Sequence, residues 1–480
     1  MSYNKQLVIF SAVLLAIKLM LLPFVHQVDA DAVTRTYLSL QFAENPHIIK
    51  SGTWLPFYFY IFGGALKIYG NQLITPVVLN ILFSVLLLFP LFHLLKRMFD
   101  EKIAFLLCLF FSLSPMVFRM SLLAMSEMPY IFFVISGISI FVQGIEKNKL
   151  LYVLLAGMLM GIATGIRYES WLIGSLVSLF LICRKWYKKA VVFALPFAVF
   201  PLYWLISNYF NTNDVFNSFN WAIDAPEANP VDSWETFFRR LGWQPMSLIF
   251  AFGPIAFYFV VKTFKVIPIK TNQINRILIL FFLIFFLIWE INSIRGSLLL
   301  QHRFAITLFL FSFPFLGYYL AKQKNYLLHK TLFMSISAIL LTYVYSSQDA
   351  RPVPRLLTDD AQSALKAIKN NLNENDAFIC DFWNWETTYC IPFSTKLPQN
   401  NIVIIQNNED ETTIVKNVAG LIQQKEQGVL LIKKHSVFHS LLSVQGNNIM
   451  LKGNPEIQLK VTKIFENDSI LCYLYTRKQT

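Results

Sequence analysis

The sequence predicts a polytopic α-helical membrane protein with about eleven transmembrane helices and a small C-terminal α/β domain. Hydrophobic residues make up 55% of the 480 residues and charged residues only 14%, whereas about a quarter of the residues of a soluble protein are charged. Apolar runs recur up to residue 348, and most approach the ~20 residues that a helix needs to cross a bilayer. Beyond residue 348 the sequence is more polar and alternates helix and strand patterns.

These observations predict two domains, a transmembrane domain at residues 1–348 and a soluble domain at residues 349–480. The apolar runs within the first domain are interpreted as spans. The expected spans cover residues 6–25, 73–95, 103–118, 127–145, 150–165, 169–183, 190–209, 246–262, 277–294, 304–321 and 330–348.

The orientation of these spans follows from the charge of the gaps between them. Counting residues 26–72 as the first gap, the even-numbered gaps hold sixteen Lys and Arg residues, and the longer odd-numbered gaps hold nine. Because basic loops stay in the cytoplasm, the N-terminus is expected inside and the soluble domain outside the cell. The net charge of +13 is spread over short clusters between apolar runs, so no nucleic-acid partner is expected.

An alternative is that residues 1–32 form a cleaved signal peptide. Ala30 and Ala32 make a suitable cleavage pattern. Lys18 interrupts the apolar run, however, and Asp29 and Asp31 crowd the cleavage site. These residues favour a retained first span, and cleavage would leave the rest of the topology unchanged.

Two outer loops, at residues 26–72 and 210–245, are long. In the first, "TRTYLSLQFAEN" predicts an amphipathic helix, and the aromatic segment "SGTWLPFYFYIFGGALKIYG" predicts a re-entrant or interfacial helix. In the soluble domain, "DDAQSALKAIKNNLNEN" and "DETTIVKNVAGLIQQKEQG" predict helices. Four further segments predict strands: "AFICDFW", "NIVIIQN", "VLLIKK" and "IQLKVTKIF", followed by "SILCYLYTR" as the last strand. This domain has no Gly-rich phosphate loop, and no chemistry is assigned to it.

Ionisable residues gather at the expected outer ends of the spans, where charges are costly and often serve a site. A solvated loop charge explains any one of these residues equally well. It does not explain why the whole set lies at the outer ends of the spans. The tight outer turns use Arg, whose planar fork suits phosphate oxygens. Carboxylates and arginines on one membrane face suit a substrate that carries a phosphate and reacts through a hydroxyl. The set comprises Asp29, Asp31, Arg119, Glu127, Arg167, Glu169, Glu290, Arg295, His302 and Arg303.

Several of these residues lie in motifs that resemble those of GT-C membrane glycosyltransferases. The acid after the first span and the segment "SGTWLPFYFYIFG" resemble the first outer loop of these enzymes, and "AMSEMPYIFF", "GIATGIRYESWL" and "HRF" follow in the expected order. The closest likeness is to bacterial protein O-mannosyltransferases and to the lipid A aminoarabinose transferase, over about residues 6–320. The acidic pair is Asp-Ala-Asp here, whereas protein mannosyltransferases have Asp-Glu.

The resemblance implies transfer of a sugar from a polyprenyl-phosphate donor to an acceptor hydroxyl or amine of a protein, lipid or glycan. The displacement inverts the anomeric carbon, and a carboxylate takes the acceptor's proton. Asp31 is the expected base, with Asp29 the second candidate or a metal ligand, and Glu127 is expected to orient the acceptor. No cofactor is certain, and a divalent cation, Mg²⁺ or Mn²⁺, is left open. The candidates for binding the donor phosphate are Arg167, Arg295, His302 and Arg303.

Three other functions compete with this one. A lipid or solute transporter would show internal repeats and charges near the bilayer midplane, but the charges lie at the outer ends of the spans. A non-catalytic scaffold leaves the outer arginines and acids unexplained. A polysaccharide polymerase or ligase shares the substrate class and is the hardest to separate.

Overall fold

The computed structural model describes most of the chain. The described residues are 2–24, 30–71, 74–218, 233–264, 273–297, 300–322, 327–348, 359–381, 395, 397–405 and 410–477. Their contacts divide the chain into two compact units. The first contains Met1–Val25 and His47–Pro352, and the second contains His26–Pro46 and Val353–Thr480. The second unit thus includes a segment of the first expected outer loop.

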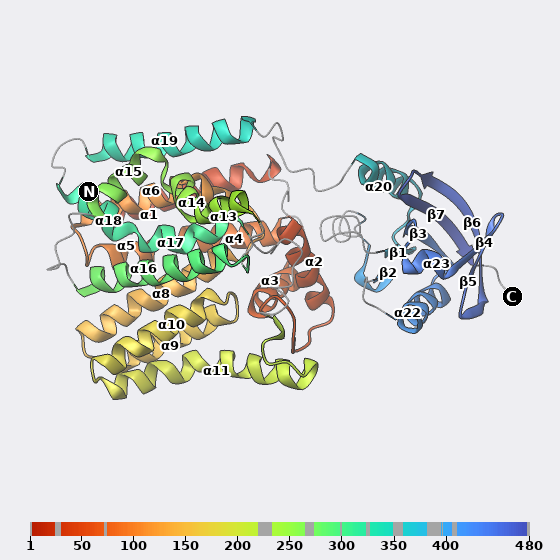
Figure 1. Ribbon diagram of the computed structural model, residues 1–480, viewed down its shortest axis with the longest axis horizontal. Helices are drawn as coiled ribbons and strands as arrows, with labels where there is room; N and C mark the ends of the chain where they lie inside the picture. Colours follow the sequence, from red (N-terminus) through yellow and green to blue (C-terminus); the bar gives the residue numbers. More distant parts are fainter. Residues whose placement is uncertain are drawn as a thin grey trace. The chain divides into compact units, whose positions relative to one another are not determined.

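The first unit is built from helices (Figure 1). In chain order they are α1 (Tyr3–Met20), η1 (Leu22–Phe24), α3 (Phe57–Ile68), α4 (Thr75–Leu86), α5 (Leu88–Leu95), α6 (Glu101–Leu113), α7 (Pro115–Ser121), α8 (Glu127–Glu146), α9 (Leu150–Thr164), α10 (Glu169–Cys183), α11 (Tyr187–Thr212), α13 (Trp234–Leu241), α14 (Trp243–Phe252), α15 (Pro254–Phe264), α16 (Gln273–Ile294), η2 (His302–Ala305), α17 (Ile306–Phe311), α18 (Phe313–Lys322) and α19 (Leu327–Gln348). Helix α3 coincides with the expected re-entrant segment.

Each expected span coincides with a helix or with a bent pair of helices. In the described part of the chain, five helices are long and apolar enough to cross a membrane, and the number rises to eight if each of three bent pairs is one span. The remaining apolar helices, Phe57–Ile68, Leu150–Thr164, Glu169–Cys183 and Leu327–Leu341, are shorter. The expected count of eleven spans is therefore not confirmed.

The expected span at residues 246–262 is not one straight helix. The helices on either side of Gly253 meet at an angle of 114°. Gly253 has a φ of +73°, and a Cβ there would lie 2.6 Å from the backbone nitrogen of Ala338. This conformation and this close approach both require glycine. Pro254 then begins the next helix, at a position where its missing N–H costs nothing.

The second unit contains a seven-stranded sheet and several helices (Figure 1). The strand order is β2-β1-β3-β7-β6-β5-β4. Strands β2, β1 and β3 are parallel, and the remaining neighbours are antiparallel. The elements are α2 (Ala30–Glu44), α20 (Asp359–Asn371), β1 (Ala377–Asp381), η3 (Gln399–Asn401), β2 (Ile402–Ile405), α22 (Glu411–Gln424), β3 (Gln427–Lys433), α23 (Val437–Ser440), β4 (Leu442–Gln445), β5 (Asn448–Leu451), β6 (Asn454–Glu466) and β7 (Ile470–Arg477).

The sheet carries a hydrophobic core on each face, because successive strand residues point to opposite faces. On β1, Ile379 belongs to the core that includes residues of α22, whereas Phe378 belongs to the core that includes residues of α20. Val33 and Tyr37 of α2 belong to this second core. The expected helices and strands of this region are confirmed, but the β4–β5 hairpin was not expected from the sequence.

Candidate functional site

The N-terminal end of α8 supplies the first acid of the site. Glu127 is the first residue of α8 and follows the short connection at residues 122–126. A carboxylate at this end is favoured by the helix dipole. Pro129 is tolerated in the first turn, because the N–H groups there have no partner within the helix. The Glu127 side chain is only 1% exposed. A carboxylate removed from water in this way needs compensating partners.

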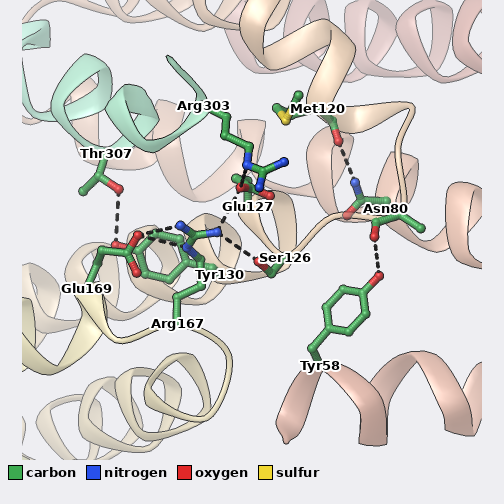
Figure 2. Close-up of polar contacts among 11 residues, drawn as sticks. Tyr58, Asn80, Met120, Ser126, Glu127, Tyr130, Arg167, Glu169, Arg303 and Thr307 are labelled. Atoms are coloured by element: carbon green, nitrogen blue, oxygen red, sulfur yellow. Dashed lines mark hydrogen bonds and ion pairs between the residues drawn. The ribbon is translucent and has the colours of Figure 1, made fainter. Parts of the chain in front are cut away.

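Arg167 is the main partner of Glu127. It lies between α9 and α10, and its Nη1 donates hydrogen bonds to Glu127 Oε1 at 2.9 Å and to Ser126 Oγ at 3.0 Å. Its Nε and Nη2 both donate to Glu169 Oε1, at 3.0 and 2.7 Å. Figure 2 shows the guanidinium lying between the two carboxylates. All three nitrogens of Arg167 therefore already donate within the protein.

A second arginine approaches the same acid from η2. Arg303 Nε lies 3.5 Å from Glu127 Oε1, and the Arg303 side chain is 8% exposed. The Phe304 ring centroid is 5.4 Å from Cζ of Arg167 and 5.5 Å from Cζ of Arg303. Tyr130, one turn along α8, has its ring 5.8 Å from Cζ of Arg167. These are cation–π distances, so aromatic rings line both guanidinium groups.

We call Glu127, Arg167, Glu169 and Arg303 the Glu127 network. Its two acids and two arginines compensate in charge. Burial lowers the pKa of Arg167, but Glu169 and Glu127 outweigh this effect and hold the pKa above its ordinary value. Glu127 Oε2 is buried and has no hydrogen-bond partner among the described residues. An acceptor in this situation is suited to a hydroxyl or amine donor from a bound molecule.

His302 precedes Arg303 and has its own partners. The His302 ring stacks on Trp243, with centroids 4.3 Å apart and planes 4° apart. Its Nδ1 lies 2.7 Å from Ser247 Oγ, and Ser247 Oγ donates to the carbonyl of Trp243 at 2.8 Å. Trp243 and Ser247 thus hold the His302 ring in place.

The remaining expected site residues are Arg295, Asp31 and Asp29. Arg295 follows α16 and its side chain is exposed. Asp31 lies in the first turn of α2, within the second unit, and Asp29 falls outside the described residues. In the part of the chain that the structure describes, no group of three or more His, Cys, Asp and Glu side chains is placed to hold a metal ion.

Several contacts of the site were not expected from the sequence. Arg167 was expected to bind a phosphate, but the structure gives it Glu127, Glu169 and Ser126 as partners. Ser247 was not singled out at all, because a lone serine in an apolar run carries no signal. Its importance depends on its closeness to His302, 55 residues further along the chain.

The arrangement of the helices defines a class of protein. ArnT from Cupriavidus metallidurans, solved bound to undecaprenyl phosphate, is similar over 98% of each chain, with a TM-score of 0.66 and 12% identity. The archaeal oligosaccharyltransferase AglB from Archaeoglobus fulgidus, solved with an inhibitory peptide and a dolichol-phosphate, is similar over 88% of this chain and 69% of its own. Its TM-score is 0.50 and its identity 12%. At these identities the likeness establishes the fold, which is that of the GT-C membrane proteins.

A family model matches part of the chain. Residues 50–220, from α3 to α11, match the family model described as dolichyl-phosphate-mannose-protein mannosyltransferase. No match was found among curated proteins. The family match and the fold together place the chain in the GT-C superfamily of membrane glycosyltransferases. The resemblance inferred from the sequence motifs is confirmed, and the protein is a multi-pass membrane protein.

Proposed function

We propose that this protein transfers a sugar from a polyprenyl-phosphate-linked donor to an acceptor hydroxyl or amine on the outer face of the membrane. The observation that carries the proposal is the buried, charge-compensated Glu127 network within a GT-C fold. Buried charges are costly to assemble, and this reaction uses both negatively charged groups, for the acceptor, and positively charged groups, for the leaving phosphate. The undecaprenyl phosphate of the ArnT structure and the dolichol-phosphate of the AglB structure support a lipid-phosphate donor. The acceptor is a protein, a lipid or a glycan.

The reaction is an inverting displacement. The acceptor oxygen or nitrogen attacks the anomeric carbon, the bond from that carbon to the phosphate oxygen breaks, and its electron pair stays on the polyprenyl phosphate. In this proposal Asp31, with Asp29 the alternative, takes the acceptor's proton. Glu127 orients the acceptor through its unpartnered oxygen. Positive charge next to the leaving phosphate stabilises the transition state.

The phosphate contacts are proposed to come from Arg303, His302 and Arg295, with Arg167 in a supporting role. Arg303 Nε lies 3.5 Å from Glu127 Oε1, and each nitrogen of Arg167 donates to a protein acceptor. Because Arg167 is already engaged with these acceptors, we assign direct contact with the donor to Arg303. Arg167 instead holds Glu127 and Glu169 at a fixed separation.

Replacing Arg303 with Lys is expected to lower transfer by about tenfold, because lysine keeps the charge but loses the planar fork of donors. The measurement is release of polyprenyl phosphate and transfer of labelled sugar by the purified protein in nanodiscs, over a panel of polyprenyl-phosphate sugars. Arg239→Lys is a matched control, because Arg239 is an exposed arginine of α13. Equal rates for parent and Arg303→Lys protein would remove Arg303 from the phosphate site. Absence of transfer with every donor would contradict the proposed function. Extension of the acceptor by several sugars would favour a polysaccharide polymerase.

The proposal places the second unit outside the cell and the basic connections inside. Single cysteines are expected to react with a membrane-impermeant maleimide on intact cells when placed at the exposed Asn417 of α22. Cysteine at the exposed Lys147, between α8 and α9, is expected to react only after the membrane is opened. The control is the protein with all five native cysteines replaced by Ser, which also serves as the background for both single-cysteine variants. The reverse labelling pattern would contradict the proposed orientation.

A further inference from the structure

The connection between α7 and α8 is a buried, non-helical segment. It covers residues 122–126, and its Leu123, Ala124, Met125 and Ser126 are each at most 3% exposed. Connections usually run over a protein's surface, because buried backbone groups need hydrogen-bond partners. This one ends directly at Glu127, so its conformation determines where the Glu127 carboxylate lies.

Two buried side chains from other helices donate hydrogen bonds to carbonyls of this segment and of the end of α7. Asn80 on α4 donates from Nδ2 to the carbonyl oxygens of Met120 and Leu123, at 2.7 and 2.5 Å. The hydroxyl of Tyr58 on α3 donates to the carbonyl oxygen of Ala124 at 2.7 Å. Asn80 and Tyr58 are both fully buried. Figure 2 shows both residues next to the segment that leads to Glu127.

The same end of α3 also contacts the segment that carries Arg167. The backbone N–H of Phe57 donates to the carbonyl of Gly165 at 2.9 Å. A Cβ at Gly165 would lie 2.3 Å from Cγ of Phe57, so only glycine permits this approach. Consecutive residues of one helix, Phe57 and Tyr58, thus contact the two segments that present Arg167 and Glu127 to each other.

We propose that Tyr58 and Asn80 are positioning residues for sugar transfer, which fix residues 120–127 and thereby align Glu127 with Arg167 and Arg303. This inference rests on the proposed function of the Glu127 network. The side-chain hydrogen bonds described above for Tyr58 and Asn80 go to backbone carbonyls, so in this proposal the two residues act through the backbone and not by touching substrate. A small displacement of Glu127 is enough to slow transfer, since a shift of about 1 Å can slow an enzyme by about 100-fold.

The mildest test is Tyr58→Phe, which removes one hydroxyl and keeps the ring. We expect the kcat for transfer to fall by about tenfold while the KM for the donor changes by less than about twofold. Tyr60→Phe is the matched control, because its hydroxyl on the same helix accepts from the N–H of Ile49. Asn80→Leu is the second variant, with Ser84→Ala on the same helix as its control, because Ser84 contacts Lys18 and Ile81. If Tyr58→Phe and Asn80→Leu match their controls, the inference is wrong.

A double-mutant cycle distinguishes positioning from a general loss of stability. If Tyr58 acts through Glu127, then Tyr58→Phe should lower transfer by less than about twofold once Glu127 is already Gln, because coupled residues are not additive. A further full tenfold loss in that background would show that Tyr58 acts independently and would overturn the inference.

Hydrogen exchange separates this inference from the proposed function. Amides of residues 120–130 in the full-length protein in nanodiscs are expected to exchange faster in Tyr58→Phe and Asn80→Leu than in Tyr60→Phe and Ser84→Ala. This measurement needs no substrate. If these two variants exchange faster but the parent protein transfers no sugar, the proposed function is refuted and the role of Tyr58 and Asn80 in placing Glu127 stands. Unchanged exchange would refute that role.

Discussion

Replacing Asp31 with Asn is expected to slow sugar transfer by about 100-fold or more, the loss typical of removing a general base. Asparagine is nearly isosteric with aspartate but cannot take a proton from the acceptor. Asp31 lies in the first turn of α2, where a helix holds it in a defined direction. The measurement is transfer of radiolabelled sugar from polyprenyl phosphate in purified membranes, with donor binding followed separately.

The controls for this variant separate three roles. Glu411→Gln removes an exposed first-turn acid from α22 of the same unit and is expected to leave transfer unchanged. Asp29→Asn is expected to lower transfer less than Asp31→Asn does, unless the two acids bind a cation. If they do, added Mg²⁺ or Mn²⁺ should partly restore activity. Loss of donor binding in Asp31→Asn would assign Asp31 to binding instead of proton transfer. Parent rates in both Asn variants would place the base elsewhere.

The second large effect is expected at Glu127. Glu127→Gln removes the buried one of two acids that compensate Arg167 and Arg303, whose side chains are 12% and 8% exposed, and breaking a buried ion pair costs about 3–5 kcal/mol. We expect a fall in transfer of about 100-fold or more, together with a lower melting temperature. The measurements are transfer and thermal unfolding of the same purified sample.

The matched control for Glu127 is Glu101→Gln. Glu101 is also the first residue of a helix, α6, but its side chain is exposed. Its replacement is expected to change stability by less than about 0.5 kcal/mol, as is usual at the surface. Parent activity in Glu127→Gln, measured on protein that remains folded, would show that the Glu127 network is structural and would remove its support for the proposed function.

The fold was largely predictable where a single chain segment determines it. Apolar runs predicted the helices of the first unit, because a long apolar stretch indicates a membrane-spanning helix. The bend at Gly253 was missed, since the run from residue 246 to 262 is apolar throughout and the close approach to Ala338 is a tertiary contact. The β4–β5 hairpin was missed because its strands have only four residues each.

The site was predictable in composition but not in pairing. Glu127, Arg167 and Arg303 were each identified from their places at span ends, and the structure brings them together. Which carboxylate an arginine meets depends on helix packing, so the partnership of Arg167 with Glu169 and Glu127 was not foreseen. Asn80 and Tyr58 gave no signal, because a polar group that caps a distant carbonyl looks like any other buried polar residue in sequence.

Helix α2 is translated early, but its apolar partners are translated late. Val33 and Tyr37 share their hydrophobic cluster with Ile368 and Phe378, more than 300 residues further along the chain. While the ribosome completes the helices in between, this face of α2 lacks its apolar partners, because domains fold as units once their residues have emerged. The helix that bears Asp31 is therefore expected to reach its native packing only after the last part of the chain has been synthesised. Prematurely terminated chains would then insert into the membrane without becoming active.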